Sequence, residues 1–175
     1  THTSLIVAYG KAGKVDLAFD QFNTMTKKDK IEPTIVTYGA LMDALSREVG
    51  RRSGNGGFKS NNKKDISYVK DALDRVFNLR SDLQASGLQM DVRVLNCLVS
   101  ACGRAAAFEE LRTDALDRAF DIVAESRRNG LFPDAITYSS LMSGCVNAGE
   151  PQRALALYDE METKGVARTA SVYAT

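Results

Sequence analysis

The side chains best suited to metal binding or nucleophilic catalysis are one histidine and three cysteines. His2 has no cysteine or glutamate at the spacing of a zinc site, and Cys97, Cys102 and Cys145 form no C-x-x-C pair. An odd number of cysteines favours a reducing compartment, in which each thiol is a small residue buried on a helix face. The sequence therefore predicts no metal site and no disulfide.

Catalytic motifs are absent as well. The sequence contains neither a G-x-S-x-G run nor a glycine-rich phosphate loop. Glu110, Asp114 and Asp117 have the spacing of solvated charges along one helix. We therefore expect a protein that is not an enzyme and that needs no cofactor.

Composition narrows the class of partner. The chain has 175 residues, of which 44% are hydrophobic, and a formal net charge of +1. Nucleic-acid binding would therefore have to come from a local face and not from an overall basic character. No apolar run reaches the roughly 20 residues of a membrane helix, so no membrane insertion is expected. Because the sequence starts with Thr1 and stops within a helical pattern, it is expected to be a fragment of a longer protein.

Residues 132–169 predict two short helices joined by a tight turn. Both halves carry apolar residues at a period near 3.6, which places a stripe on one face of each helix. Gly149 is suited to the residue after a helix end, Pro151 to the first turn of the next helix, and Gly165 to closing that second helix. Neither helix can bury its stripe alone.

This helix pair recurs along the chain. The leucine of its first helix reappears in the set Leu5, Leu41, Leu98 and Leu141. Residues 71–77, which precede Gly87, match residues 114–120, which precede Gly130. The recurrence predicts one array with units at about 1–34, 35–91, 92–134 and 135–169 and the start of a fifth at 170–175. The four leucines are predicted to occupy equivalent buried positions.

Three places depart from the regular unit. A glycine-rich insertion near 48–65 is predicted as a loop; from 47 to 65 it has six basic and two acidic side chains. It is either a solvated insertion or an arm that contacts phosphates or a partner. A shorter insertion around residues 105–111 lengthens the next helix or adds a short one. The connection before Ile31 has one extra residue and lacks the expected glycine.

The repeated unit resembles the pentatricopeptide repeat (PPR) family, whose unit reads roughly V-T-Y-N-x-L-I, K-A-G, E-A-x-x-L-F-x-x-M and G-x-x-P-D. The matching residues are Lys11, Ala12, Gly13, Ala18, Phe22, Met25 and Pro33 in the first unit, Val36, Thr37 and Tyr38 in the second, and Ile136, Thr137, Tyr138, Ala154, Tyr158 and Met161 in the fourth. The resemblance implies an all-α fold, a right-handed α-α superhelix, in a plastid (chloroplast) or mitochondrion.

The resemblance also implies positions that read RNA bases. In this family one reading residue follows the tyrosine of the V-T-Y run and the other follows the G-x-x-P connection. The resulting pairs are Thr3 with Thr34, Gly39 with Asp91, Asn96 with Asp134, and Ser139 with Thr169, while Ala174 would open a fifth unit. The residues expected to flank the bases are Val36, Arg93, Ile136 and Ser171. Asn96 with Asp134 matches a pair that goes with uracil in the family.

Two functions follow as alternatives. One is binding of single-stranded RNA, in support of organellar RNA processing, stability or translation. The other is a protein-binding helical scaffold within an organellar assembly such as a ribosome, an RNA polymerase or a maturation complex. A concave face that is basic and carries aligned polar readers indicates RNA, and a mixed or apolar concave face indicates protein.

Overall fold

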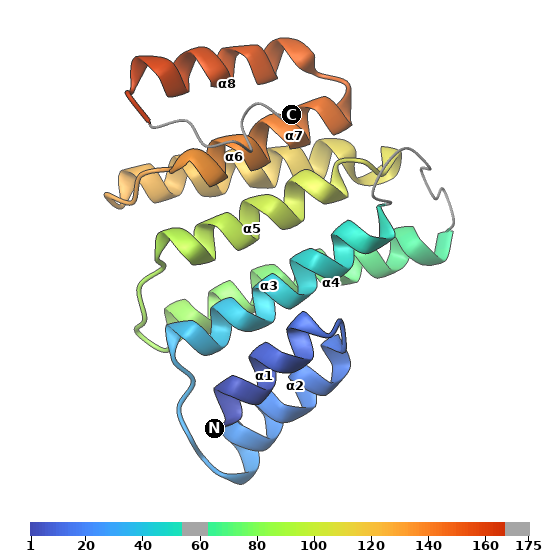
Figure 1. Cartoon of the computed structure of the whole chain (residues 1–175), viewed down its shortest axis with the longest axis vertical. Helices are drawn as coiled ribbons and strands as arrows, with labels where there is room; N and C mark the ends of the chain where they lie inside the picture. The colour runs from blue at the N-terminus through green and yellow to red at the C-terminus, as the bar shows by residue number, and fades with distance from the viewer. Residues whose placement is uncertain (54–62, 167–175) are drawn as a thin grey trace.

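The computed structural model describes residues 1–53 and 63–166, and that part contains α-helices and no strand (Figure 1). The α-helices are α1 His2–Lys11, α2 Val15–Asn23, α3 Ile35–Arg52, α4 Lys63–Ala85, α5 Val92–Ala105, α6 Arg112–Arg128, α7 Ala135–Ala148 and α8 Pro151–Thr163. A π-helical turn, Thr24–Lys28, follows α2, and a 3-10 helix, Glu109–Leu111, precedes α6.

The helices stack in two layers. The first-helix layer contains α1, α3, α5 and α7, and the second-helix layer contains α2, α4, α6 and α8 (Figure 1). Each helix of the first layer packs against its neighbours in that layer and against its own second helix. One apolar core runs along the stack and includes Leu45, Val69, Leu98, Leu116 and Tyr138. This arrangement, in which neighbouring pairs bury each other's stripes, confirms the all-α fold predicted from the repeats.

The predicted turn between the last two helices is confirmed. Gly149 follows α7 in the left-handed region with φ of 77°. Pro151 then occupies the first turn of α8, where a missing N–H costs nothing. Gly165 closes α8 with φ of 64°.

The connection that lacks its glycine is closed differently. Lys30 has φ of 52° and is the non-glycine residue of the described chain in the left-handed region. Gly87 and Gly130 take this conformation at the corresponding connections, with φ of 73° and 77°. The π-helical turn just before Lys30 accommodates the extra residue of this connection.

Three of the four recurring leucines are buried, and one is not. Leu41, Leu98 and Leu141 are at most 1% exposed, but Leu5 is 46% exposed. The prediction that all four are equally buried was therefore wrong for Leu5.

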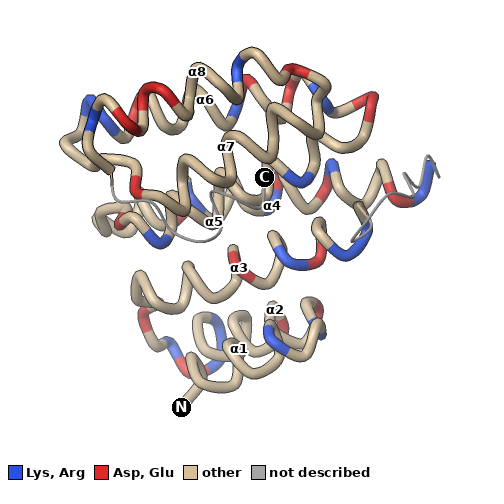
Figure 2. The backbone as a smooth tube through the Cα atoms, turned by 45° about the horizontal axis from the view of Figure 1, so that its top comes forward, with Lys and Arg blue, Asp and Glu red and all other residues tan. Residues whose placement is uncertain are grey.

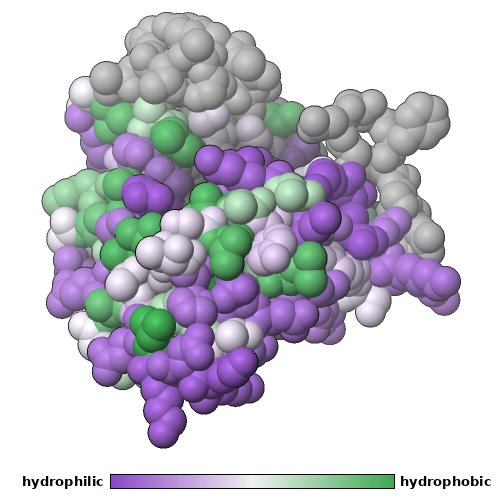
Figure 3. Space-filling view, turned by 60° about the horizontal axis from the view of Figure 1, so that its bottom comes forward, coloured by the Kyte–Doolittle hydropathy of each residue, from purple (hydrophilic) through white to green (hydrophobic). Residues whose placement is uncertain are grey.

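The reason lies in what each helix packs against. Thr37 and Ala44 of α3 contact α1, and Leu41 lies on the same face of α3 because it is four residues after Thr37. The corresponding residues of α1, Leu5 among them, are exposed because the described helices that pack against α1, which are α2 and α3, do not cover this face. Figure 3, which views the α1–α2 end, shows apolar patches among hydrophilic ones, and Leu17 of α2 is also exposed.

The predicted loop near 48–65 is partly helical. Helix α3 continues to Arg52 and α4 begins at Lys63, so both ends of the predicted loop are wrong. Arg52 bridges the two helices, because it bonds Glu48 of α3 and Asp65 of α4 at 3.1 and 2.9 Å. Residues 54–62 lie outside the described part. In the third unit the extra residues form the short 3-10 helix before α6, one of the two predicted outcomes.

Arginine–aromatic pairs connect successive helices of the second layer. In each pair an arginine lies over the phenylalanine ring of the preceding second helix. The pairs are Arg75 with Phe19, Arg118 with Phe77 and Arg153 with Phe120, at 3.9, 5.3 and 4.2 Å from the ring centroid. The same contact thus recurs between successive repeats in the second-helix layer.

All three cysteines are free thiols; Cys102 and Cys145 are buried and Cys97 is partly buried. Among the described helices, none combines the length and the apolar character that crossing a bilayer requires.

Candidate functional site

Asn96 and Asp134 meet at the edge of the first-helix layer. Asn96 projects from α5, and Asp134 is the N-cap of α7, with its side chain accepting from the N–H groups of Ile136 and Thr137. The Asn96 Nδ2 donates to both carboxylate oxygens of Asp134, at 3.2 and 3.1 Å. Two residues 38 positions apart in sequence thus form one polar pair, as the pairing in the sequence analysis expected.

The buried residue Thr137 hydrogen-bonds both members of this pair. Its side chain is buried, and its hydroxyl donates to Asn96 Oδ1 at 2.5 Å. The same hydroxyl accepts from the Asp134 N–H at 3.2 Å, which completes a capping box. The orientation of the Asn96 amide is therefore set from both ends.

A similar triad connects α1 and α3. Thr34 is the N-cap of α3, and Thr37 is the buried residue three positions later. The Thr37 hydroxyl lies 3.2 Å from that of Thr34 and 3.1 Å from that of Thr3 in α1. Thr3 and Thr34 are thus linked through Thr37.

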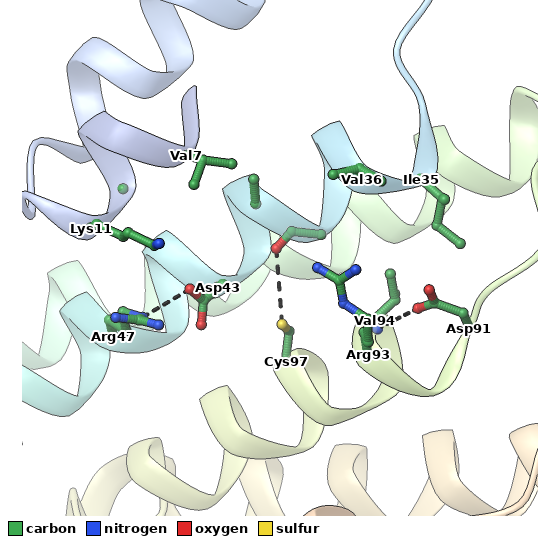
Figure 4. A pocket seen from close by; sticks show the side chains of 13 residues that line it. Val7, Lys11, Ile35, Val36, Asp43, Arg47, Asp91, Arg93, Val94 and Cys97 are labelled. Atoms are coloured by element: carbon green, nitrogen blue, oxygen red, sulfur yellow. Dashed lines mark hydrogen bonds and ion pairs between the residues drawn. The ribbon is translucent and has the colours of Figure 1, made fainter. Parts of the chain in front are cut away.

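The second pair, Gly39 and Asp91, lines a cavity of about 390 Å³ between α3 and α5 (Figure 4). Gly39 has no side chain, so the space that Asn96 fills in the next unit is open here. Asp91 caps α5 by accepting from the Val94 N–H at 2.8 Å, and Val94 also lines the cavity. The reading position without a side chain thus coincides with a cavity.

The expected flanking residues are exposed next to these pairs. Val36 and Ile136 are 44% and 52% exposed, and Arg93 is also exposed. Figure 4 shows Val36 on α3 and Arg93 on α5 at the Gly39 cavity. An apolar side chain and a guanidinium plane can both stack on a base.

Basic side chains continue from this cavity along the first-helix layer. Lys11 and Arg47 line the Gly39 cavity and also a second depression of about 430 Å³, which Arg51 and Arg104 line as well. Arg47 pairs with Asp43 at 2.8 Å, and Arg51 pairs with Glu48. The arginines of α3 gather toward its C-terminal end (Figure 2). The layer therefore carries polar side chains at the expected reading positions together with cationic groups of the kind that contact phosphates.

Burial sets the ionisation of two groups here. Arg104 donates to the carbonyl and hydroxyl oxygens of Ser46 at 2.8 and 3.0 Å. Burial lowers the pKa of the Arg104 guanidinium. The Cys97 thiol contacts the Gly39 carbonyl, and desolvation raises its pKa to about 12. A protonated thiol at neutral pH is a poor nucleophile.

Of the fourth expected pair, Ser139 with Thr169, only Ser139 lies in the described part of the chain. Ser139 is partly exposed on α7. Thr169, Ser171 and Ala174 lie outside the described residues. Within residues 1–53 and 63–166, no group of three or more His, Cys, Asp or Glu side chains could hold a metal ion.

Sequence reasoning missed part of this site. Thr37 and Thr137 are the third residues of their helices and contact the preceding reading residue, yet they stood out only as part of the V-T-Y pattern. Thr34, Asp91 and Asp134 are N-caps. The signal that could have shown this is a Thr or Asp directly before an apolar-periodic segment.

Two segments match repeat models. Residues 1–47 match the PPR repeat family, and residues 136–166 match the PPR repeat. A chloroplastic pentatricopeptide repeat-containing protein of Arabidopsis thaliana is 24% identical over 112 residues, which are 64% of this chain and 18% of that protein. The chain thus spans about a fifth of the length of this relative.

Solved structures share the fold. PPR10 in complex with an 18-nt psaJ RNA element superposes with a TM-score of 0.75 at 23% identity, covering 98% of this chain and 21% of PPR10. The PPR domain of Arabidopsis thaliana protein-only RNase P 1 in complex with tRNA gives a TM-score of 0.63 at 16% identity, covering 98% of this chain and 79% of that domain.

Proposed function

Because the chain belongs to the pentatricopeptide repeat family, we propose that its first-helix layer binds single-stranded RNA with a preference at individual bases. One observation carries this proposal: the Asn96 amide is held against the Asp134 carboxylate at an edge flanked by exposed Arg93 and Ile136. That arrangement provides a polar group for a base edge and two surfaces for its faces.

The chemistry of the Asn96 pair fits a pyrimidine. Each amide has two donor hydrogens and an acceptor oxygen. One Nδ2 hydrogen goes to Asp134 and one Oδ1 lone pair to Thr137. A second N–H and a second lone pair remain for a base, which matches the neighbouring acceptor and donor on the uracil edge. Because the Asn96–Asp134 pair matches the pair that goes with uracil in the family, we propose uracil for this unit.

Stacking and phosphate contacts supply most of the affinity. Arg93 and Val36 border the Gly39 cavity, which admits a base between α3 and α5. Lys11 and Arg47 lie further along the same cavity, where they can approach the phosphates of a strand whose bases face the reading pairs. Binding is therefore expected to weaken as the salt concentration rises.

The described segment has few readers, so the expected affinity is modest. Stacking gives roughly 1–3 kcal/mol per base, and association costs at least about 4 kcal/mol. Three described reading positions thus give dissociation constants no tighter than the micromolar range.

PPR10 and the RNase P domain, two structures with a similar fold, were solved in complex with RNA. This chain matches about a fifth of PPR10.

Fluorescence anisotropy with a labelled single-stranded RNA tests the proposal. The RNA has one uracil in a cytosine background, and the salt concentration is titrated. The wild-type chain should bind the uracil-containing RNA more tightly than oligocytosine, and Asn96→Ala with Asp134→Ala should abolish that difference. Asp117→Ala removes an exposed carboxylate from α6 in the second-helix layer and serves as the matched control.

Two outcomes of this experiment would contradict the proposal. Absence of RNA binding at low salt would refute the proposal and favour the protein-binding scaffold. A uracil preference that survives the double substitution would place the reading residues elsewhere. The chloroplastic relative supports a plastid or mitochondrial location for this protein, which import of a fluorescent fusion can check.

A further inference from the structure

We infer that Thr137 is a positioning residue that makes the Asn96 unit prefer uracil over cytosine by fixing the Asn96 side-chain amide in one orientation. The inference rests on the proposed RNA binding. It concerns a residue buried beneath the reading pair and not one that touches the base.

Three hydrogen bonds define the role of Thr137. Its hydroxyl oxygen accepts from the Asp134 N–H at 3.2 Å, so its single proton is free for another partner. The nearest acceptor is Asn96 Oδ1 at 2.5 Å, closer than Asp134 Oδ1 at 3.1 Å. A carboxylate only accepts, so Asp134 takes the Asn96 Nδ2. Thr137 and Asp134 thus require the same amide orientation.

Amide orientation decides which pyrimidine fits. Uracil presents a carbonyl acceptor beside the N3–H donor, whereas cytosine presents an amino donor beside the N3 acceptor. An amide fixed with its N–H and C=O in one order pairs with one of these edges, and a 180° flip pairs with the other. Without the Thr137 hydroxyl, only Asp134 would oppose the flip of Asn96, and the discrimination between the two bases should fall.

The other repeats support this assignment independently. In α3, α5 and α7 the third residue is buried and faces the reading residue of the preceding unit; these third residues are Thr37, Val94 and Thr137. Thr37 bonds to Thr3, as Thr137 bonds to Asn96. Val94 instead faces Gly39, where a Cβ on the glycine would lie 3.9 Å from Val94 Cγ2. The hydroxyl is present where the facing reading residue is polar and absent where that residue has no side chain.

The experiment measures a ratio of affinities. Two RNAs that differ only in uracil or cytosine at the position read by Asn96 are titrated against the full chain by fluorescence anisotropy. Wild type is expected to prefer uracil about tenfold. Thr137→Val keeps the buried volume but removes the hydroxyl, and its preference should fall below about threefold. Thr137→Ser restores the hydroxyl and should restore most of the preference.

Ser126→Ala is the matched control. It removes a buried hydroxyl from α6 in the second-helix layer, where Ser126 donates to the Val123 carbonyl at 2.9 Å, so the uracil preference should persist. Circular dichroism checks that each variant keeps its helix content. An unchanged uracil preference in Thr137→Val, or an equal loss in Ser126→Ala, would overturn the inference.

A second measurement keeps the inference testable without RNA. The Asn96 Nδ2 protons should exchange slowly with water in wild type and in Thr137→Ser, and faster in Thr137→Val, when the exchange is followed by NMR. Equal exchange rates in all three proteins would overturn the inference. Failure of wild type to bind either RNA would instead refute the proposed function.

Discussion

Replacement of Lys30 by glycine should stabilise the protein. Lys30 is exposed and takes φ of 52°, in the region that glycine occupies at Gly87 and Gly130. The backbone on either side fixes this conformation: the Asp29 N–H donates to Thr24 and the Ile31 N–H donates to Met25, at 3.0 and 2.9 Å. The Lys30 side chain makes no hydrogen bond or ion pair in the described part of the chain, so its removal costs no such contact.

The size of the effect follows from two opposing terms. A non-glycine residue in the left-handed region costs about 1–2 kcal/mol. Glycine also destabilises the folded state by about 0.4–1 kcal/mol relative to other residues, because it has more conformational freedom in the unfolded chain. The net stabilisation from Lys30→Gly is therefore about 0.5–1 kcal/mol, or roughly 1–4 °C in melting temperature for a chain of this length.

Urea unfolding followed by circular dichroism measures this difference. The Lys30→Gly midpoint should rise at constant slope, whereas Lys30→Ala, which removes the charge but keeps the Cβ, should stay close to wild type. The converse change, Gly87→Ala, should destabilise by a similar amount, because a Cβ there meets nothing within 4 Å and only the backbone is strained. A midpoint for Lys30→Gly at or below that of Lys30→Ala would refute the reasoning.

Two further outcomes are expected. Leu98→Ala should lower the free energy of unfolding by about 2–5 kcal/mol, because Leu98 is fully buried; Leu5→Ala, at an exposed position, should cost far less in the same urea titration. Burial raises the Cys102 pKa from 9.0 to about 12, so its contribution to stability is present below pH 9 and is lost as pH rises toward 12. Cys102→Ala should reduce the stability lost between pH 8 and 10.5 by about 1–2 kcal/mol.

The sequence was sufficient where local chemistry decides the structure. The period of 3.6 predicted both helices of the last pair, and Gly149 with Pro151 predicted the turn between them, because those residues favour the conformations observed. It was insufficient where a helix depends on its neighbours. Leu5 and Leu98 belong to the same pattern, but only Leu98 has a helix on both sides in the first layer.

The candidate site also combines features that the sequence predicted with features that depend on how neighbouring helices pack. The resemblance to the repeat family was enough to expect Asn96 and Asp134 as a pair, and they lie side by side although they are 38 residues apart. It gave no role to Thr137, whose hydroxyl reaches Asn96 only because α5 and α7 pack side by side. Nor could it show that the missing side chain at Gly39 leaves a cavity, since the facing residues come from α3 and α5 together.

In the proposed function, the N-caps connect helix stability with RNA recognition. Asp134 accepts from two N–H groups of α7 and from Asn96 through the same carboxylate, so a substitution there weakens the helix start and the reading pair together. Asp91 caps α5 in the same manner, but it faces Gly39 and has no amide to orient. Changes in base preference are therefore better sought at Asn96, Thr137 and Gly39, which can vary without removing a helix cap carboxylate.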